Sequence, residues 1–367
     1  MRLITRLLAW YLSTAIVRYY AALAAIAVVV ASLIEFLENR DGLMDMPGLT
    51  AFDALWFSLL SAPAIFSLLA GFVAFVAVLV ACIALLRHSE LKVMLAAGLT
   101  YGQLLVAVLP AALLMAGFHF VMENVVLPKS TAALHDWNIA DAGRQAGEPD
   151  AIWVRQGDYI LSVGRLRKSD ETLHDVRLFA LAPGGHMVWY ASGPSAHFEP
   201  GSLVFPKASR GVSGAPRAFR VRNLRIETPL DFPLLSALAL KPRQTSAWKI
   251  GRVLHQTAAG SYPRYVYELW FHKKLAGPLL TALAVLLLAP LVQHAHRLGA
   301  VPLLLIGIST GFLCFVADAV LAGMGEAGLL SPVVAAWGLD GVLALTIAAA
   351  PFAWGERSVL EQGTTVR

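Results

Sequence analysis

Residues 85–99 read LLRHSELKVMLAAGL and separate two long apolar stretches of the chain. The segment carries the start and stop signals of a short helix of its own, over residues 88–98. Ser89 is a favoured N-cap residue, and Glu90 follows in the first turn, where the helix dipole favours an acid. Gly98 suits the left-handed position that ends a helix. The charged or titratable side chains of the segment are Arg87, His88, Glu90 and Lys92.

Two interpretations of this short helix are equally good on physical grounds. One is a connector between two membrane helices, the second of which opens with a capping box of Thr100 and Gln103. The other is a helix on the membrane surface that docks on a partner protein. His88, Leu91 and Met94 share one face at helical spacing. The separate caps and this partly apolar face favour the docking helix.

The composition is typical of a polytopic membrane protein. Of the 367 residues, 57% are hydrophobic and only 14% are charged, which is outside the usual range of soluble globular proteins. The net charge of +5 comes without a dense run of lysine and arginine, so no nucleic-acid partner is expected. Cys82 and Cys314 lie within apolar stretches, where packing is expected rather than a disulfide or a metal site.

Six stretches are long and apolar enough to cross a membrane, since a helical span needs roughly 20 residues. The first continues to Leu37 and is too long for a cleaved signal peptide, so it is expected to be retained. The mixed segment before it, TRLLAWYLSTAIV, suggests a separate interfacial helix. The expected spans are residues 18–37, 64–86 with Pro63 in the first turn, 100–126 with a kink at Pro110, 275–292, 301–321 and 333–354.

Lysine and arginine in the short loops determine the orientation. With the N-terminus inside, these residues gather on the cytoplasmic side, as the positive-inside rule requires. Both termini are therefore expected in the cytoplasm and the large polar insert on the opposite side. The basic residues on the expected cytoplasmic side are Arg2, Arg6, Arg87, Lys92, Arg297, Arg357 and Arg367.

The insert after the third span is rich in predicted strands. IWVRQGDYILSVGRL, residues 152–166, gives two alternating runs around Gly157 and Asp158, which is a hairpin signal. Several further short strands at regular spacing favour a sandwich or jelly roll. Tyr159 and Trp189 are expected in its core, with an aromatic groove for an acyl chain as the alternative. The predicted organisation is an N-terminal membrane half (1–127), a β-jelly-roll domain (128–270), a C-terminal membrane half (271–355) and a tail (356–367).

The segment RHSELKVMLAAGL resembles the coupling-helix signature of the permease subunits of the lipopolysaccharide exporter, an ABC transporter of Gram-negative bacteria. The resemblance extends over nearly the whole chain, through six spans and a periplasmic β-domain after the third. It is closer to the LptG type than to its LptF sister. The further patches that carry it are IWVRQGDYILSVGRL, RYVYELWFHKKLAGPL (264–279) and GISTGFLCFVADAV (307–320).

The resemblance implies that two sister permeases, LptF-like and LptG-like, sit on a dimer of a cytoplasmic LptB-like ATPase. Each coupling helix would insert into one ATPase subunit. Glu90 falls on the family's coupling glutamate, and Leu91 and Met94 would supply an apolar knob beside it. Lipopolysaccharide would then pass from the inner membrane to an LptC-like jelly-roll protein and an LptA-like bridge. The ATPase-coupling set expected here is Arg87, Ser89, Glu90, Leu91, Met94 and Gly98.

The substrate path is expected to offer cations near the outer leaflet, because lipopolysaccharide carries phosphates. Lys273 and Lys274 match a basic position of the family at the outer end of the fourth span. The first span departs from the family pattern, with Glu35 where relatives carry a lysine and Arg40 one turn away. The alternative for each cation is an interfacial anchor. Asp318, near the outer end of the fifth span, is expected to have a structural or gate-polar role.

Three further features complete the predictions. Gly307 and Gly311 permit close helix approach, and the family uses its first and fifth spans as gates against the partner permease. Asp340 is expected to cap a helix that starts there, after an interfacial lead-in over residues 329–339. His294 and His296 lie two apart without a Cys or an acid to complete a metal site.

The sequence offers no phosphate-binding loop of the G-x-x-x-x-G-K-[ST] type and no hydrolase arrangement, and few buried polar pairs are expected within its spans. We therefore expect a permease subunit without enzymatic activity or a cofactor of its own, driven by ATP on a separate subunit. The alternatives are a permease for another lipid or lipoprotein, and a membrane-anchored scaffold that docks envelope proteins without transport.

Overall fold

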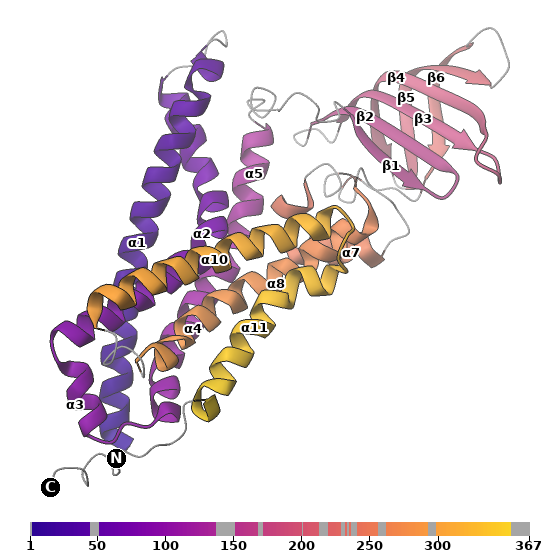
Figure 1. Cartoon of the computed structure of the whole chain (residues 1–367). Coiled ribbons are helices and arrows are strands. Elements are labelled where there is room, and N and C mark those ends of the chain that lie inside the picture. The colour runs from indigo at the N-terminus through magenta and orange to yellow at the C-terminus, as the bar shows by residue number, and fades with distance from the viewer. Residues whose placement is uncertain are drawn as a thin grey trace, which may run out of the picture. The chain divides into compact units, whose positions relative to one another are not determined.

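The computed structural model describes residues 2–44, 51–136, 151–167, 172–199, 201–212, 219–228, 232, 235, 241–255, 262–292 and 299–353 (Figure 1). The chain divides into two compact units. Unit 1 consists of Met1–Glu35, Ala62–Glu123 and His272–Arg367. Unit 2 consists of Phe36–Ser61 and Asn124–Phe271.

Six helical segments of the described chain are long and apolar enough to cross a membrane, as the sequence predicts. They lie in α1 (Arg2–Met44), α2 (Ala51–Arg87), α4 with α5, α8, α10 and α11. The third span combines α4 (Tyr101–Val121), a π-helical turn (Met122–Val126) and α5 (Leu127–Asp136). The last three are α8 (Arg264–Leu286, with the span continuing to Val292), α10 (Ala300–Glu326) and α11 (Pro332–Ala353).

Several helix boundaries differ from the prediction. The separate interfacial helix before the first span is wrong, because α1 is continuous from Arg2 to Met44. Pro63 lies well inside α2 instead of in its first turn, which a membrane helix tolerates when neighbouring groups satisfy the freed carbonyl. The lead-in before Asp340 is also wrong, because α11 starts at Pro332. The carbonyl of Ser331 accepts a hydrogen bond from the Ala335 amide at 3.0 Å. Pro332 is the first residue of the helix, a position that suits a proline.

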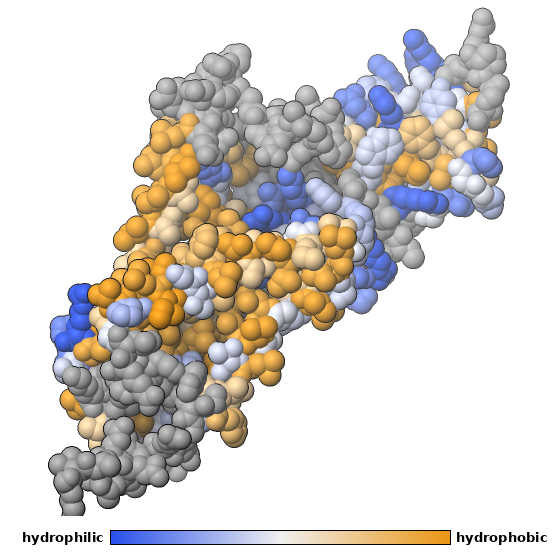
Figure 2. Space-filling view, viewed as in Figure 1, coloured by the Kyte–Doolittle hydropathy of each residue, from blue (hydrophilic) through white to orange (hydrophobic). Residues whose placement is uncertain are grey.

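The core of unit 1 is formed by apolar side chains from all six spans, among them Leu12, Leu79, Met115, Leu288 and Ile347. The spans are covered very unequally by the rest of the chain. The most apolar window of α8 is 67% buried, whereas those of α1 and α10 are only 11% and 17% buried. Figure 2 shows the resulting hydrophobic surface over α1 and α10. These two helices therefore present most of their apolar length to lipid or to a partner.

The inserted domain in unit 2 contains one six-stranded antiparallel sheet with its strands in sequence order. The strands are β1 (Ile152–Gln156), β2 (Tyr159–Arg167), β3 (Thr172–Leu181), β4 (Met187–Glu199), β5 (Ser202–Val212) and β6 (Phe219–Glu227). Gln156 pairs with Tyr159, which confirms the predicted hairpin, and Gly157 has a φ of +55° in its turn. This order is that of a meander, so the two-sheet jelly roll is not confirmed in the described residues.

One face of the sheet forms a core with helices of the same unit. Leu161, Leu178 and Phe205 from the strands cluster with Ile250 of α7 (Ala247–His255) and Tyr267 of α8. Tyr159 and Trp189 are only partly buried at the margin of this core, with their rings 6.3 Å apart. Both aromatic residues thus contribute to the core, as expected.

Candidate functional site

The segment between the second and third spans forms a separate short helix, α3 (Glu90–Ala96). Ser89 occupies the position before it, and its carbonyl accepts from the Val93 amide at 3.3 Å. Its φ of +60° differs from the extended backbone of most N-cap residues. The chain therefore turns sharply between α2, which ends at Arg87, and α3.

The end of α3 is a Schellman motif. Gly98 has a φ of +76°, and the Leu99 amide donates to the Met94 carbonyl at 3.3 Å. Thr100 and Gln103 then form the predicted capping box that opens α4. The capping signals of the sequence therefore lie next to both ends of the helix, but α3 is shorter than the expected helix over residues 88–98. It is separate from the two spans.

One side of α3 is anchored on unit 1 and another faces outward. Met94 and Leu99, whose backbones the Schellman motif joins, are partly buried against the apolar core of unit 1. Val93 is 68% exposed, and Arg87 and His88, which precede the helix, are exposed as well. Met94 therefore anchors α3 within this chain, and its role in an apolar knob for the ATPase stays a prediction. The side chain of Leu91 lies outside the described residues.

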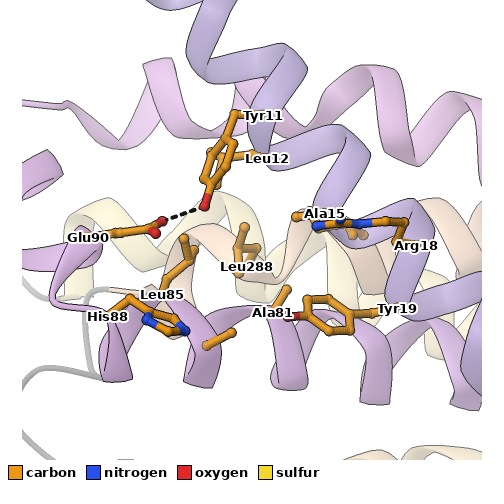
Figure 3. Close-up of a pocket in the computed structure, with 12 residues that line it drawn as sticks. Tyr11, Leu12, Ala15, Arg18, Tyr19, Ala81, Leu85, His88, Glu90 and Leu288 are labelled. Atoms are coloured by element: carbon orange, nitrogen blue, oxygen red, sulfur yellow. Dashed lines mark hydrogen bonds between the residues drawn. The ribbon is translucent and has the colours of Figure 1, made fainter.

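Glu90 forms a hydrogen bond to the first span. The hydroxyl of Tyr11 on α1 donates to Oε2 of Glu90 at 2.8 Å (Figure 3). The bond borders a hollow of about 240 Å³, whose other polar lining residues are Arg18, Tyr19 and His88. Figure 3 shows Tyr11 reaching down from α1 toward the carboxylate. This contact could not be predicted from the sequence, because the two residues are 79 positions apart.

Lys273 and Lys274 are both held in ion pairs inside unit 1. Nζ of Lys274, which is 0% exposed, lies 3.7 Å from Oε1 of Glu123 and donates to the Glu123 carbonyl at 3.2 Å. Lys273 pairs with Asp318 of α10. Neighbouring lysines of α8 thus connect this helix to the π-helical turn on one side and to α10 on the other. Neither lysine is therefore an interfacial anchor on the surface, which was the alternative interpretation.

A buried polar group lies next to these pairs and contradicts the expectation of few buried polar pairs within the spans. His119 Nδ1 lies 2.8 Å from the hydroxyl of Thr281, and the hydroxyl donates to the Gly277 carbonyl at 3.2 Å. Whether Nδ1 of His119 donates or accepts in the first bond depends on the tautomer of the ring. Its Nε2 lies 3.5 Å from Oε2 of Glu123. A π-helical turn is a frequent mark of such sites, but it has no clear sequence signature.

The other positions singled out in the sequence do not form a common site in the described part of the chain. Glu35 is partly buried on α1, whereas the side chain of Arg40 lies outside the described residues. Asp340 is 3% exposed inside α11, so its predicted capping role is wrong. His294 and His296 also fall outside the described residues, and no group of three or more potential metal ligands occurs in the described part of the chain.

Gly307 and Gly311 permit a close helix approach, as predicted, and the neighbour is α2 of the same chain. A methyl group added to Gly307 would come within 2.5 Å of Leu79, and one added to Gly311 within 2.5 Å of Phe75. Both neighbours are buried core residues of unit 1. The pair therefore fixes the packing of α10 on α2 and is not an exposed contact for a partner permease.

The comparison with known families covers almost the whole chain. A family model described as "Lipopolysaccharide export system permease LptF/LptG" matches residues 10–351. The match includes α3, the inserted sheet and parts of all six spans. It covers both members of the family, so the closer resemblance to the LptG type stays a prediction. No curated protein sequence matches the chain.

Proposed function

The chain belongs to the lipopolysaccharide export system permease LptF/LptG family, and we propose that it is the membrane subunit of an ATP-driven exporter. It extracts lipopolysaccharide from the inner membrane and passes it to a periplasmic protein bridge. Its partners are a sister permease, a dimer of a cytoplasmic ATPase, and jelly-roll proteins that form the bridge. Both termini lie in the cytoplasm and the six-stranded sheet lies in the periplasm.

The observation that carries this proposal is the short helix α3. It is separated from the neighbouring spans by a left-handed residue at each end, Ser89 and Gly98. Met94 packs against the core of unit 1, to which α3 belongs, whereas Val93 is exposed, as are Arg87 and His88 just before the helix. A helix anchored on one side and open on the other can transmit a push from a bound ATPase to the spans.

The unequal coverage of the spans supports a partner within the membrane. The least buried spans lie in α1 and α10, and α10 and the part of α1 up to Glu35 belong to unit 1. A sister permease that packs along these helices would enclose a lipid-sized space between two apolar surfaces. This arrangement suits an amphiphile whose acyl chains remain in an apolar environment during extraction.

Native mass spectrometry of the tagged chain, isolated from its own membranes in mild detergent, tests the proposed assembly. The expected mass is this chain, one sister permease and two copies of an ATPase, with lipopolysaccharide retained. A chain that emerges alone or as a homo-oligomer, under conditions that keep other ABC complexes intact, contradicts the proposal. A non-transporting scaffold would then be the better account.

A further inference from the structure

We propose that Tyr11 is the positioning residue for Glu90 and the link through which the coupling helix α3 moves the first span. This inference rests on the proposed function, since it assigns Glu90 to the contact with the ATPase. It adds a residue on α1 to that contact and a route from the ATPase to a membrane-spanning helix.

The bond itself joins two elements that are otherwise distant along the chain. Tyr11 lies in α1 and Glu90 is the first residue of α3. The hydroxyl donates to Oε2 at 2.8 Å, which is a good length for a hydrogen bond to a carboxylate. A carboxylate has two oxygens and can accept several hydrogen bonds. Tyr11 therefore orients the Glu90 carboxylate without neutralising it, and Oε1 can accept from a basic side chain of the ATPase.

The anchoring of α1 makes Tyr11 a suitable point for transmitting movement. Immediately after Tyr11, one side of α1 is packed in the core of unit 1, and Ser13 donates to the Ala107 carbonyl at 3.1 Å. Farther along, the helix is largely uncovered by the chain. A displacement applied at Tyr11 therefore acts on the packed end of a helix whose other end has few internal contacts. The residues that form the packed side are Leu12, Ile16, Tyr20 and Ala24.

Among the described residues, the other contacts of α3 and of the turn after it are of a different kind. Met94 and Leu99 hold it to unit 1 through apolar contacts, which are non-directional and allow sliding. The Tyr11–Glu90 hydrogen bond is directional and fixes α3 against α1 in one register. A movement of α3 on the ATPase therefore reaches α1 through this bond, and the apolar contacts keep the helix docked throughout.

The test uses the whole complex in liposomes and measures ATP hydrolysed per lipopolysaccharide molecule released. Tyr11→Phe keeps the ring and the charge of Glu90 and removes only the donor. The expected result is a rise of up to about tenfold in the ATP hydrolysed per lipid released. A change of this size corresponds to the loss of one hydrogen bond to a charged group. Assembly of the complex and its melting temperature stay unchanged, because Tyr11 is 46% exposed. Tyr19→Phe is the matched control, since Tyr19 lines the same hollow from the same helix.

A rescue variant separates positioning from a merely structural role. With 4-aminophenylalanine at position 11, an N–H donor is restored and ATP per lipid returns toward the wild-type value. Two results overturn the inference: equal coupling in wild type, Tyr11→Phe and Tyr19→Phe, or a loss of assembly in Tyr11→Phe that the amine does not restore. A wild-type complex that releases no lipid under ATP contradicts the proposed function instead, so the two failures are distinguishable.

Discussion

Lys274 is fully buried, and its Nζ lies 3.7 Å from the carboxylate and 3.2 Å from the carbonyl oxygen of Glu123. The pair connects α8 to the π-helical turn of the third span. A lysine in this position needs its partner, because an uncompensated buried charge is very costly. The ion pair therefore stabilises the contact between these two spans and is not available as a free cation on the substrate path.

Removing one member of this pair is expected to destabilise unit 1 strongly. Lys274→Met keeps the length of the side chain and leaves the Glu123 carboxylate buried without its ammonium, at a cost of about 3–5 kcal/mol. The combined Lys274→Met and Glu123→Gln variant should lose less than the sum of the two single variants. Thermal unfolding in detergent measures this, with Lys207→Met on the exposed surface of β5 as the control. Additive losses would mean that the pair is not coupled.

The close packing of α10 on α2 gives a second prediction. Gly307→Ala places a methyl group within 2.5 Å of Leu79 and should lower the stability of unit 1 by about 1–3 kcal/mol. Gly323→Ala is the same change in the same helix, where no atom lies within 4 Å, and it should be neutral or slightly stabilising. The test compares the melting temperatures of the two variants in detergent, and Gly307→Ala should melt at the lower temperature. Equal melting temperatures would show that α10 can move away from α2 without a loss of stability.

The Schellman motif at the end of α3 predicts a local effect on ATPase binding. Gly98→Ala forces a side chain into a φ of +76°, which costs about 1–2 kcal/mol and frays the last turn of α3. The amount of ATPase recovered with the chain should fall, without a change in membrane insertion. Gly102→Ala in α4 meets no atom within 4 Å and serves as the control. Full recovery of the ATPase with Gly98→Ala would show that the motif is dispensable.

A labelling experiment tests the orientation of the chain in the membrane. Val93 on α3 and Val188 on β4 are both exposed, and cysteines at these positions should react with a membrane-impermeant maleimide from opposite sides. Val188→Cys is expected to react in cells whose outer membrane alone is permeabilised. Val93→Cys should react only after the inner membrane is opened, with the unmodified chain as the background for Cys82 and Cys314. The reverse pattern would invert the topology.

Local signals in the sequence predicted much of the fold. Apolar stretches identified all six spans, and the β1–β2 hairpin followed from alternation around Gly157. Gly98 and the Thr100–Gln103 box fixed the end of α3 and the start of α4. The expected sixth span, from residue 333, begins within one residue of α11, and Ser331 followed by Pro332 is a helix-start pattern there. The additional helix start expected at Asp340 was wrong, because an acid inside a span resembles a helix boundary in the sequence.

The sequence could not reveal contacts between distant positions. Tyr11 and Glu90 are 79 residues apart, and His119 and Thr281 are 162 apart. Each of these residues is unremarkable in its own segment, and only tertiary packing brings the pairs together. For the same reason the glycines of α10 showed that a close approach occurs, but not that its partner is α2.

The most direct test of the account is ATP-driven release of lipopolysaccharide from liposomes that contain the complete complex, with wild type compared to Glu90→Ala. The account predicts that Glu90→Ala lowers release by at least about tenfold while the complex still assembles. This is the effect expected from the loss of one charge-assisted hydrogen bond. Glu227→Ala, an exposed acid on β6, should release lipid at the wild-type rate. Wild-type release by an assembled Glu90→Ala complex would contradict the coupling role of α3 and the mechanism built on it.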